Sequence, residues 1–165
     1  MKTGLVLEGG GLRGVFSAGV MDVLMEEGIE FDGAIGVSAG AAFGCNYKSR
    51  QPRRAILYNM KFAKDPRYSS MRSLIATGDL FNAQFCYHDI PEKLYPFDWE
   101  AFRQNPMEFY LVCTDVETGE PVYHLHPLFL SKKRYSFFHR FAVSAVTYIL
   151  YTYPYHRDKA LLLLP

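Results

Sequence analysis

The chain has 165 residues, of which 49% are hydrophobic and 21% are charged, and its formal net charge is +1 at pH 7. These values are typical of one globular domain with a buried core, and they exclude a largely disordered chain. The near-neutral charge and the lack of a dense basic block give no reason to expect a nucleic-acid partner.

The cysteines predict a reducing compartment. Cys45, Cys86 and Cys113 are widely separated, and none lies in a CxxC pattern or at the Cys/His spacing of a metal site. We therefore expect buried, reduced thiols. The N-terminus passes directly into an apolar strand without the pattern of a signal peptide, so the sequence predicts a cytoplasmic location.

The first part of the chain predicts a strand, a glycine loop, a helix and a second strand, in that order. A strand covers residues 3–7, and apolar residues then recur at helical spacing up to Gly28, which is typical of a helix end. A second strand over 31–37 leads into small, helix-compatible residues at 39–46. This β-α-β-α order predicts a parallel sheet covered by helices, with the two glycine-rich turns side by side at the carboxyl ends of the strands.

Later segments predict further helices and two more strands. The expected elements are an amphipathic helix over 53–62, a short helix and loop over 69–82, a strand over 107–116 and, after a turn, a strand over 121–124. The stretch 81–102 is rich in aromatic residues. We interpret it as core and subdomain packing, with a lipid-facing wall of an acyl pocket as the alternative.

The segment Gly36-Val37-Ser38-Ala39-Gly40 matches the Gly-x-Ser-x-Gly pattern, in which a serine occupies a sharp turn between a strand and a helix. The two glycines lack the Cβ atoms that would clash in such a turn. Because a predicted strand precedes the motif and a predicted helix follows it, Ser38 is a candidate nucleophile. An ordinary turn is the alternative, since glycine and serine are common in turns.

The run Gly9-Gly10-Gly11-Leu12-Arg13-Gly14 supports three interpretations. Its Gly-x-Gly-x-x-Gly spacing is typical of a dinucleotide site, but such a site also needs an acid at the end of the second strand, and Glu30 and Asp32 lie at or before its start. In the second interpretation, free amides bind the oxyanion formed when Ser38 attacks an acyl carbonyl, and Arg13 adds positive charge. The third is a tight strand-to-helix turn with a solvated arginine.

Taken together, the two motifs resemble the start of a patatin-like phospholipase. The chain contains Glu8-Gly9-Gly10-Gly11-Leu12-Arg13-Gly14, followed by Gly36-Val37-Ser38-Ala39-Gly40-Ala41, in the order and at the separation of that family. The segment Phe109-Tyr110-Leu111-Val112-Cys113-Thr114-Asp115-Val116-Glu117-Thr118-Gly119-Glu120 resembles the central strand of the family and its following turn. The resemblance covers residues 1–124.

This resemblance implies an α/β fold of three layers with a mainly parallel central sheet, incomplete at its C-terminus in this chain. It also implies a serine acyl hydrolase that acts on phospholipid or lysophospholipid esters through a serine–aspartate dyad, with no catalytic histidine, no metal and no cofactor. Carried over to these positions, Ser38 is the nucleophile, and the oxyanion hole uses Gly10, Gly11 and Arg13. The remaining motif glycines are Gly9, Gly14, Gly36 and Gly40.

The catalytic aspartate of the family belongs to an Asp-Gly-Gly or Asp-Gly-Ala motif, and no such motif follows the strand 107–116. Asp32-Gly33-Ala34 matches as text, but it precedes Ser38 on the incoming strand, where its side chain is not expected to reach the hydroxyl. Asp115 ends a strand and is the candidate base, whereas Asp158 is expected in an exposed ion pair. A histidine could also take the serine proton, although none of the five has a distinctive setting.

Residues 125–165 differ in composition from the rest, since they contain no glycine, many aromatic and basic residues and one acid. We interpret this tail as a shifted reading frame or a premature end that leaves the hydrolase fold incomplete. One alternative is a membrane-associating segment in which the basic residues at 132–134 and 140 lie near lipid phosphates, and another is an ordinary terminal helix. The uncharged run 141–155 is shorter than the roughly 20 residues that a bilayer span needs.

The sequence thus predicts a patatin-like hydrolase core over 1–124 and a tail of atypical composition over 125–165. The predicted function is acyl hydrolysis of lipid esters at Ser38, with competence depending on a base that the motifs do not identify. The alternative is a non-catalytic lipid-binding or regulatory fragment. A phospholipid or other lipid ester is the expected partner, with peripheral membrane contact.

Overall fold

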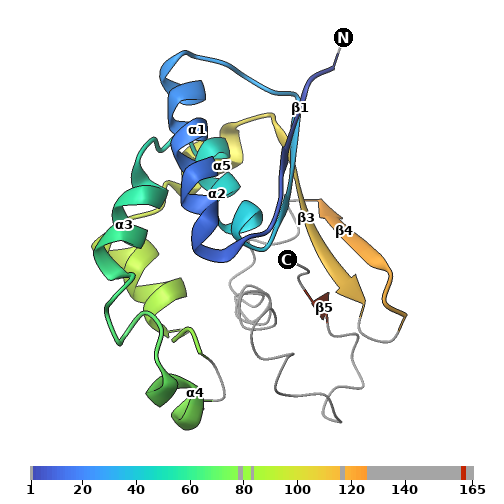
Figure 1. Ribbon diagram of the computed structural model, residues 1–165. Helices are drawn as coiled ribbons and strands as arrows, with labels where there is room; N and C mark the ends of the chain where they lie inside the picture. The colour runs from blue at the N-terminus through green and yellow to red at the C-terminus, as the bar shows by residue number, and fades with distance from the viewer. Residues whose placement is uncertain (1, 78–79, 83, 116–117, 126–160, 163–165) are drawn as a thin grey trace.

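The computed structural model describes residues 2–77, 80–82, 84–115, 118–125 and 161–162 (Figure 1). The chain forms strands and helices in the following order: β1 (Gly4–Leu7), the 3₁₀ turn η1 (Gly11–Arg13), α1 (Gly14–Glu26), β2 (Gly33–Val37), α2 (Ala39–Lys48), α3 (Arg54–Phe62), α4 (Met71–Thr77), the π-helix η2 (Phe85–Leu94), α5 (Trp99–Gln104), β3 (Glu108–Asp115), β4 (Pro121–Leu125) and β5 (Leu161–Leu162).

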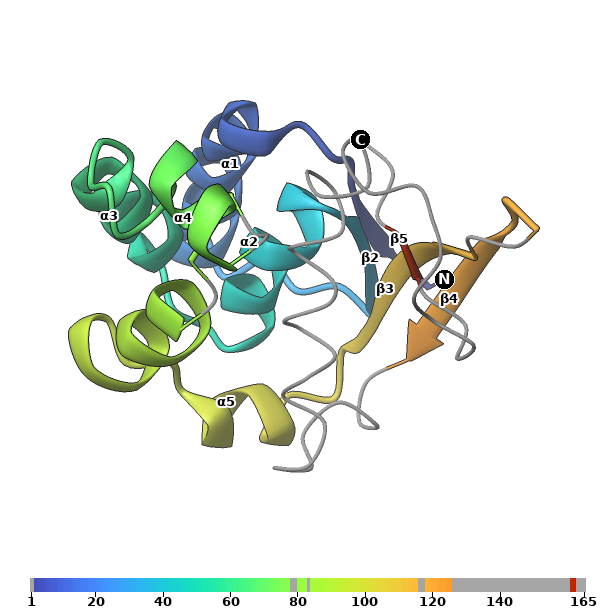
Figure 2. The ribbon, with the colours of Figure 1, turned by 90° about the horizontal axis from the view of Figure 1, so that it is seen from below.

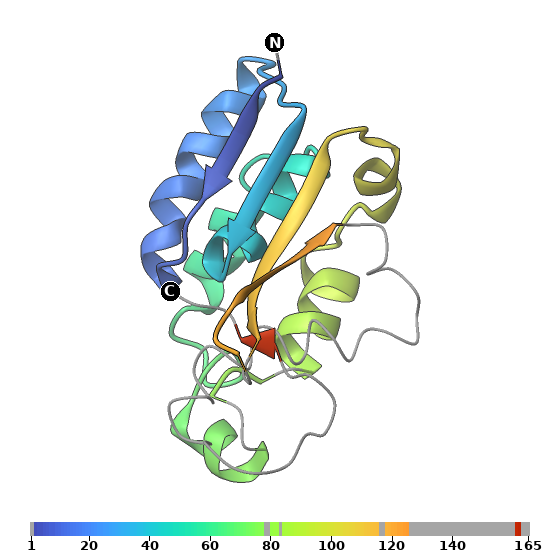
Figure 3. The same ribbon diagram turned by 90° about the vertical axis from the view of Figure 1, so that its right-hand side faces the viewer.

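The sheet is mainly parallel, as the sequence predicted. Its strand order is β1-β2-β3-β4, in which the first three strands are parallel and β4 is antiparallel to β3 (Figure 3). The short β5 pairs with the end of β3 in the antiparallel direction. Leu7 at the end of β1 lies opposite Gly36, and Gly36 lies opposite Leu111 of β3. The carboxyl ends of β1 and β2 therefore meet at one edge of the sheet, where the two glycine-rich turns begin.

The described helices all lie on one face of the sheet (Figures 1 and 3). Side chains alternate along a strand, and the alternate residues Ala34 of β2 and Phe109 and Leu111 of β3 are buried, as is Leu7 at the end of β1. Gly44 of α2 permits a close approach to the sheet, since a Cβ there would lie 2.6 Å from Leu7 Cδ1 and 3.0 Å from the Phe109 ring. This packing fixes α2, and with it the start of that helix, against the sheet.

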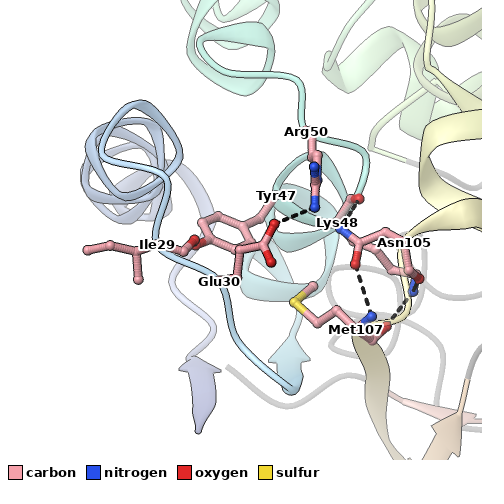
Figure 4. A network of polar contacts seen from close by, with 7 residues as sticks. All are labelled: Ile29, Glu30, Tyr47, Lys48, Arg50, Asn105 and Met107. Atoms are coloured by element: carbon pink, nitrogen blue, oxygen red, sulfur yellow. Dashed lines mark hydrogen bonds and ion pairs between the residues drawn. The ribbon is translucent and has the colours of Figure 1, made fainter.

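A polar network fixes the other end of α2 (Figure 4). Lys48 is 5% exposed, and its ammonium donates to the carbonyl oxygens of Asn105, at 2.7 Å, and Met107. The Asn105 amide returns a hydrogen bond to the Lys48 carbonyl at 2.9 Å. Nearby, the Tyr47 hydroxyl donates to the Ile29 carbonyl, and Arg50 pairs with Glu30. Burial lowers the pKa of Lys48, and the carbonyl oxygens of Asn105 and Met107 are the acceptors for its ammonium.

The aromatic stretch 81–102 contains the helix η2 and the start of α5, neither of which the sequence predicted. In η2 the Tyr95 N–H donates to the Ile90 carbonyl at 2.7 Å, which is an i→i+5 bond, and Pro91 lies inside the helix. Phe85 of η2 packs against Phe62 of α3, with ring centroids 5.2 Å apart. Tertiary packing of aromatic rings therefore holds a segment that lacks helical periodicity.

Among the residues that the structure describes, no helix combines the length and the apolar composition that a bilayer span requires. The expected tail over 125–165 falls almost entirely on residues 126–160 and 163–165, which lie outside the described part of the chain.

Candidate active site

Ser38 occupies the sharp turn between β2 and α2. Its φ of 51° and ψ of −118° place a residue with a side chain in a region that favours glycine. The Ser38 carbonyl already accepts a hydrogen bond from Ala42 N–H at 3.0 Å, so α2 begins directly after it. The half-buried serine thus lies at the carboxyl end of β2 and at the N-terminus of α2 at once, which is the setting of a nucleophile in this type of motif.

The two motif glycines are required by the packing of this turn. A Cβ at Gly36 would lie 2.7 Å from Ala41 N, and a Cβ at Gly40 would lie 2.3 Å from the Leu7 carbonyl oxygen and 2.7 Å from that of Glu8. Real Cβ atoms do not approach backbone atoms so closely. The serine turn is therefore in direct backbone contact with the end of β1, where the glycine loop starts.

The glycine loop leaves backbone amides available. Gly11 has a φ of +56°, and the Arg13 N–H donates to the Gly10 carbonyl at 3.1 Å to close a tight turn. Within the described part of the chain, the N–H groups of Gly10 and Gly11 donate to no acceptor. The Arg13 side chain folds back toward the loop, since a Cβ at Gly10 would lie 3.8 Å from its Nε and 3.9 Å from its Nη2.

Gly14 connects the loop to the serine turn from the helical side. A Cβ at this first residue of α1 would lie 2.9 Å from Ala39 Cβ and 2.9 Å from the Phe43 ring. The starts of α1 and α2 therefore touch, and both helix N-termini lie at the edge that carries Ser38. Gly9 precedes Gly10 in the same loop.

The sequence analysis did not single out Ala39, the residue after the candidate nucleophile. The first N–H groups of a helix lack intrahelical acceptors and carry a partial positive charge. In Gly-x-Ser-x-Gly motifs the N–H that follows the serine contributes to the oxyanion hole. The motif could therefore have indicated Ala39, because the backbone N–H of the residue after the serine has this role whatever its side chain is.

The structure describes the backbone of the candidate base, Asp115. In the register of β2 and β3, Val37 lies opposite Val112, and β3 continues from there to Asp115. The Asp115 backbone therefore lies near the edge of the sheet where Ser38 follows Val37. Its side chain is outside the described part, as are all atoms of Asp158.

The acids before β2 have structural partners away from the serine. Asp32 precedes β2, and its carboxylate accepts hydrogen bonds from Thr3 N–H at 2.6 Å and Thr3 Oγ1 at 3.1 Å. These hydrogen bonds lower the pKa of Asp32. Glu30 pairs with Arg50. Both acids lie at the opposite end of the strand from Ser38, and the end of β2 lacks the acid that a dinucleotide site would need.

The described residues include no cluster of three or more His, Cys, Asp or Glu side chains that could bind a metal ion. Cys45 and Cys86 are free thiols, and burial raises the pKa of Cys45 to about 11 and that of Cys86 to about 12. The side chain of Cys113 lies outside the description.

Comparison with known proteins connects this geometry to a family. No characterised protein matches the chain at a significant level. The family model for patatin-like phospholipases matches residues 5–153, a range that includes the glycine loop, the serine turn and the sheet from β1 to β4. Since this match covers most of the 165 residues, the chain belongs to the patatin-like phospholipase family of lipid acyl hydrolases.

Proposed function

We propose that this protein hydrolyses lipid esters, with Ser38 as the nucleophile and the glycine loop as the oxyanion hole. The observation that carries the proposal is the strained Ser38 turn held in backbone contact with the end of β1. Strain of this kind costs on the order of 1–3 kcal/mol, and it persists where the surrounding structure enforces it, which is common at active sites.

The proposed reaction has two steps. Ser38 Oγ attacks the ester carbonyl carbon as a base accepts its proton, and the bond from the carbonyl carbon to the alcohol oxygen breaks. The departing alcohol takes a proton from the base, and water then hydrolyses the acyl-serine. Negative charge on the carbonyl oxygen is stabilised by the N–H groups of Gly10, Gly11 and Ala39, with Arg13 nearby. Asp115 is the candidate for the base.

A fluorophosphonate probe tests the nucleophile, because it forms a covalent adduct only with an activated serine. We expect labelling of the full chain at Ser38, located by mass spectrometry of the labelled peptide, and no labelling of Ser38→Ala. Ser17→Ala is the matched control, since Ser17 lies on α1 close to the glycine loop and carries the same hydroxyl. Labelling that persists in Ser38→Ala would contradict the assignment.

The base is tested with the same probe. Loss of a general base lowers the rate on the order of 10²- to 10⁴-fold, so Asp115→Asn is expected to label far more slowly than the parent chain. Equal labelling of Asp115→Asn would assign the base to another residue. If the folded parent chain is not labelled at all, the site at Ser38 lacks its base, and the non-catalytic lipid-binding alternative is favoured.

A further inference from the structure

Helix α1 is apolar on the side that faces solvent as well as on the side that faces the core. Its inner side includes Ala18 and Met21, which are buried. On its outer side, Phe16 is 81% exposed, Val20 is 47% exposed and Val23 is 56% exposed. We call these three outer residues the α1 stripe. A helix that is hydrophobic all round is normally buried, so the α1 stripe indicates a partner.

The α1 stripe is continuous, because its residues follow one another at intervals of four and three positions. Side chains at this spacing lie one above the other on the same face of a helix, about 5–6 Å apart. Asp22 faces inward, where it is buried and its carboxylate accepts a hydrogen bond from the Arg53 N–H at 2.7 Å. The outer side of α1 therefore has no charge between Arg13 and Glu26. The helix lies on the outside of the helical layer (Figures 2 and 3).

Other exposed apolar side chains are divided among separate strands and helices. They include Val6 of β1, Leu57 and Met60 of α3, and Met71 and Ile75 of α4. Within the described part of the chain, only α1 presents three such residues at helical spacing. Charged residues directly follow the exposed methionines of α3 and α4, whereas no charged side chain interrupts the α1 stripe. The α1 stripe is therefore one surface, not a group of scattered side chains.

The charges at the two ends of α1 are opposite to those that its own dipole favours. Arg13 precedes the first residue of the helix, and Glu27 follows the last. Neither belongs to an ion pair within the described residues. A helix is stabilised by acids at its N-terminus and by cations at its C-terminus, so this order is unfavourable in an isolated helix. A second helix that runs in the opposite direction would offset this cost.

An antiparallel pair of α1 helices brings these features together. Val20 lies midway between Arg13 and Glu27, about 10 Å from each along the helix axis. A twofold axis at Val20 places Phe16 beside Val23 of the partner subunit. It also places Arg13 beside Glu27 of the partner subunit. The pair is self-complementary, since apolar surface meets apolar surface and each cation meets an acid.

We propose that the protein forms a dimer through antiparallel packing of α1 against α1 of a second copy. A membrane surface matches the α1 stripe less well, because interfacial helices have cations beside their apolar face and this one ends in Glu26 and Glu27. One pair of helices gives an interface at the small end of the usual range, so the dimer is reversible. The dimer does not depend on the proposed hydrolysis, although it places an acid of each copy next to the glycine loop of the other.

Sedimentation velocity of the full chain measures this association without substrate. Over roughly 1–100 μM protein, we expect the sedimentation coefficient to rise from that of a monomer to that of a dimer. Val20→Lys places two ammonium groups next to each other on the twofold axis, and the dissociation constant should rise on the order of a hundredfold. Met60→Lys is the matched control, because it adds the same charge at an exposed apolar residue of α3 and should leave the dissociation constant unchanged.

A charge exchange tests the antiparallel geometry and leaves the α1 stripe intact. Glu27→Arg alone and Arg13→Glu alone each place like charges together, and each should weaken association about tenfold. The double variant restores opposite charges between the copies and should associate as the parent does. Within one chain the two residues are about 21 Å apart along the helix, so only pairing between copies can restore association. Both changes suit the helix dipole, so these variants are expected to fold.

Four results would overturn the dimer. The chain could remain monomeric throughout the concentration range, or Val20→Lys, verified as folded by circular dichroism, could associate as the parent does. Met60→Lys could weaken association as much as Val20→Lys, which would assign the effect to charge in general. The double exchange variant could remain as weak as the single variants, which would exclude the antiparallel arrangement. A monomeric parent whose binding to phospholipid vesicles is lost in Val20→Lys would assign the α1 stripe to a membrane instead.

Discussion

The backbone conformation of Ser38 has a cost that can be measured apart from chemistry. A φ of 51° favours glycine over any residue with a Cβ. Neither Ser38→Gly nor Ser38→Ala retains the hydroxyl, so the two variants differ only in the Cβ. We expect Ser38→Gly to be more stable than Ser38→Ala by about 1 kcal/mol in chemical denaturation.

Ser17 provides the control for this comparison. It lies inside α1, where glycine is less favourable than alanine by about 1 kcal/mol. The order of stability should therefore reverse, with Ser17→Ala above Ser17→Gly. The same order at both positions would mean that the turn at residue 38 is not strained.

Substitution by alanine should have opposite effects on stability at two glycines, Gly40 of the serine motif and Gly19 of α1. Gly40→Ala places a Cβ 2.3 Å from the Leu7 carbonyl oxygen, which neither backbone segment can avoid without moving. We expect a loss of about 3 kcal/mol in the free energy of unfolding. Gly19→Ala meets only the tip of Ile56 at 3.8 Å and should be stabilising by about 0.5–1 kcal/mol. Thermal denaturation of the two variants distinguishes a packed turn from a loose one.

The thiols should react according to their burial. Only a thiolate reacts with alkylating reagents, and burial raises the pKa of Cys45 to about 11 and of Cys86 to about 12. At pH 8 both remain protonated in the folded chain. Iodoacetamide should therefore modify these two residues on the order of a hundredfold more slowly in the native chain than in denaturant. Peptide mass spectrometry measures each rate, and equally fast modification in the native chain would contradict the burial.

At the scale of elements, Lys48 joins the end of α2 to the start of β3. Lys48→Met removes the donor and leaves the buried carbonyls of Asn105 and Met107 without it. We expect a loss of about 1–3 kcal/mol in urea denaturation. The matched control is Lys93→Met, because Lys93 is exposed and pairs with Asp89 on the surface, where a salt bridge contributes less than about 1 kcal/mol. Equal losses would show that burial of the ammonium contributes nothing.

The elements differ in how well the sequence predicted them. The β-α-β-α unit was predicted because apolar periodicity and glycine turns are local signals. The strand expected from residue 31 begins instead at Gly33, because Phe31 packs against Tyr47 and the Asp32 carboxylate is bonded to Thr3. The helix η2 was missed, since its Pro91 is a local signal against helix and its packing is tertiary.

In the candidate site too, local features could be predicted from the sequence, whereas features that depend on distant segments could not. The sharp turn at Ser38 could be predicted because its conformation depends on the backbone packing of Gly36 and Gly40, which belong to the motif. The family was predicted from the residues that form this turn and the glycine loop. The base could not be identified, because no short motif carries it and its position depends on which distant loop approaches the serine.

At the scale of the whole molecule, one end of the sheet contains stabilising polar contacts and the other end contains the candidate site. The end at the start of β2 contains the hydrogen bonds of Asp32, Lys48 and Arg50, whereas the end at Ser38 contains the strained turn and free amides. Changes at the first end should therefore alter stability while the reactivity of Ser38 in the folded chain is retained.

Asp32→Asn tests this separation. Hydrogen bonds from Thr3 lower the pKa of Asp32 below its usual 3.8, so its contribution to stability is present above that pH and is lost as pH falls through the lowered value. The variant should be less stable than the parent at pH 7, and the difference should shrink toward acid. Fluorophosphonate labelling at pH 7 and low temperature should be equal in the two chains. Slower labelling of Asp32→Asn would show that the two ends are coupled.

The contact between the starts of α1 and α2 also constrains which substitutions this protein can accept during evolution. A Cβ at position 14 would occupy space taken by Ala39 and the Phe43 ring. A lineage can therefore gain a side chain at position 14 only after position 39 has become glycine and residue 43 has become smaller. Each of these changes alone removes packing from the site, so the three positions form an epistatic set that is expected to vary together or to remain fixed.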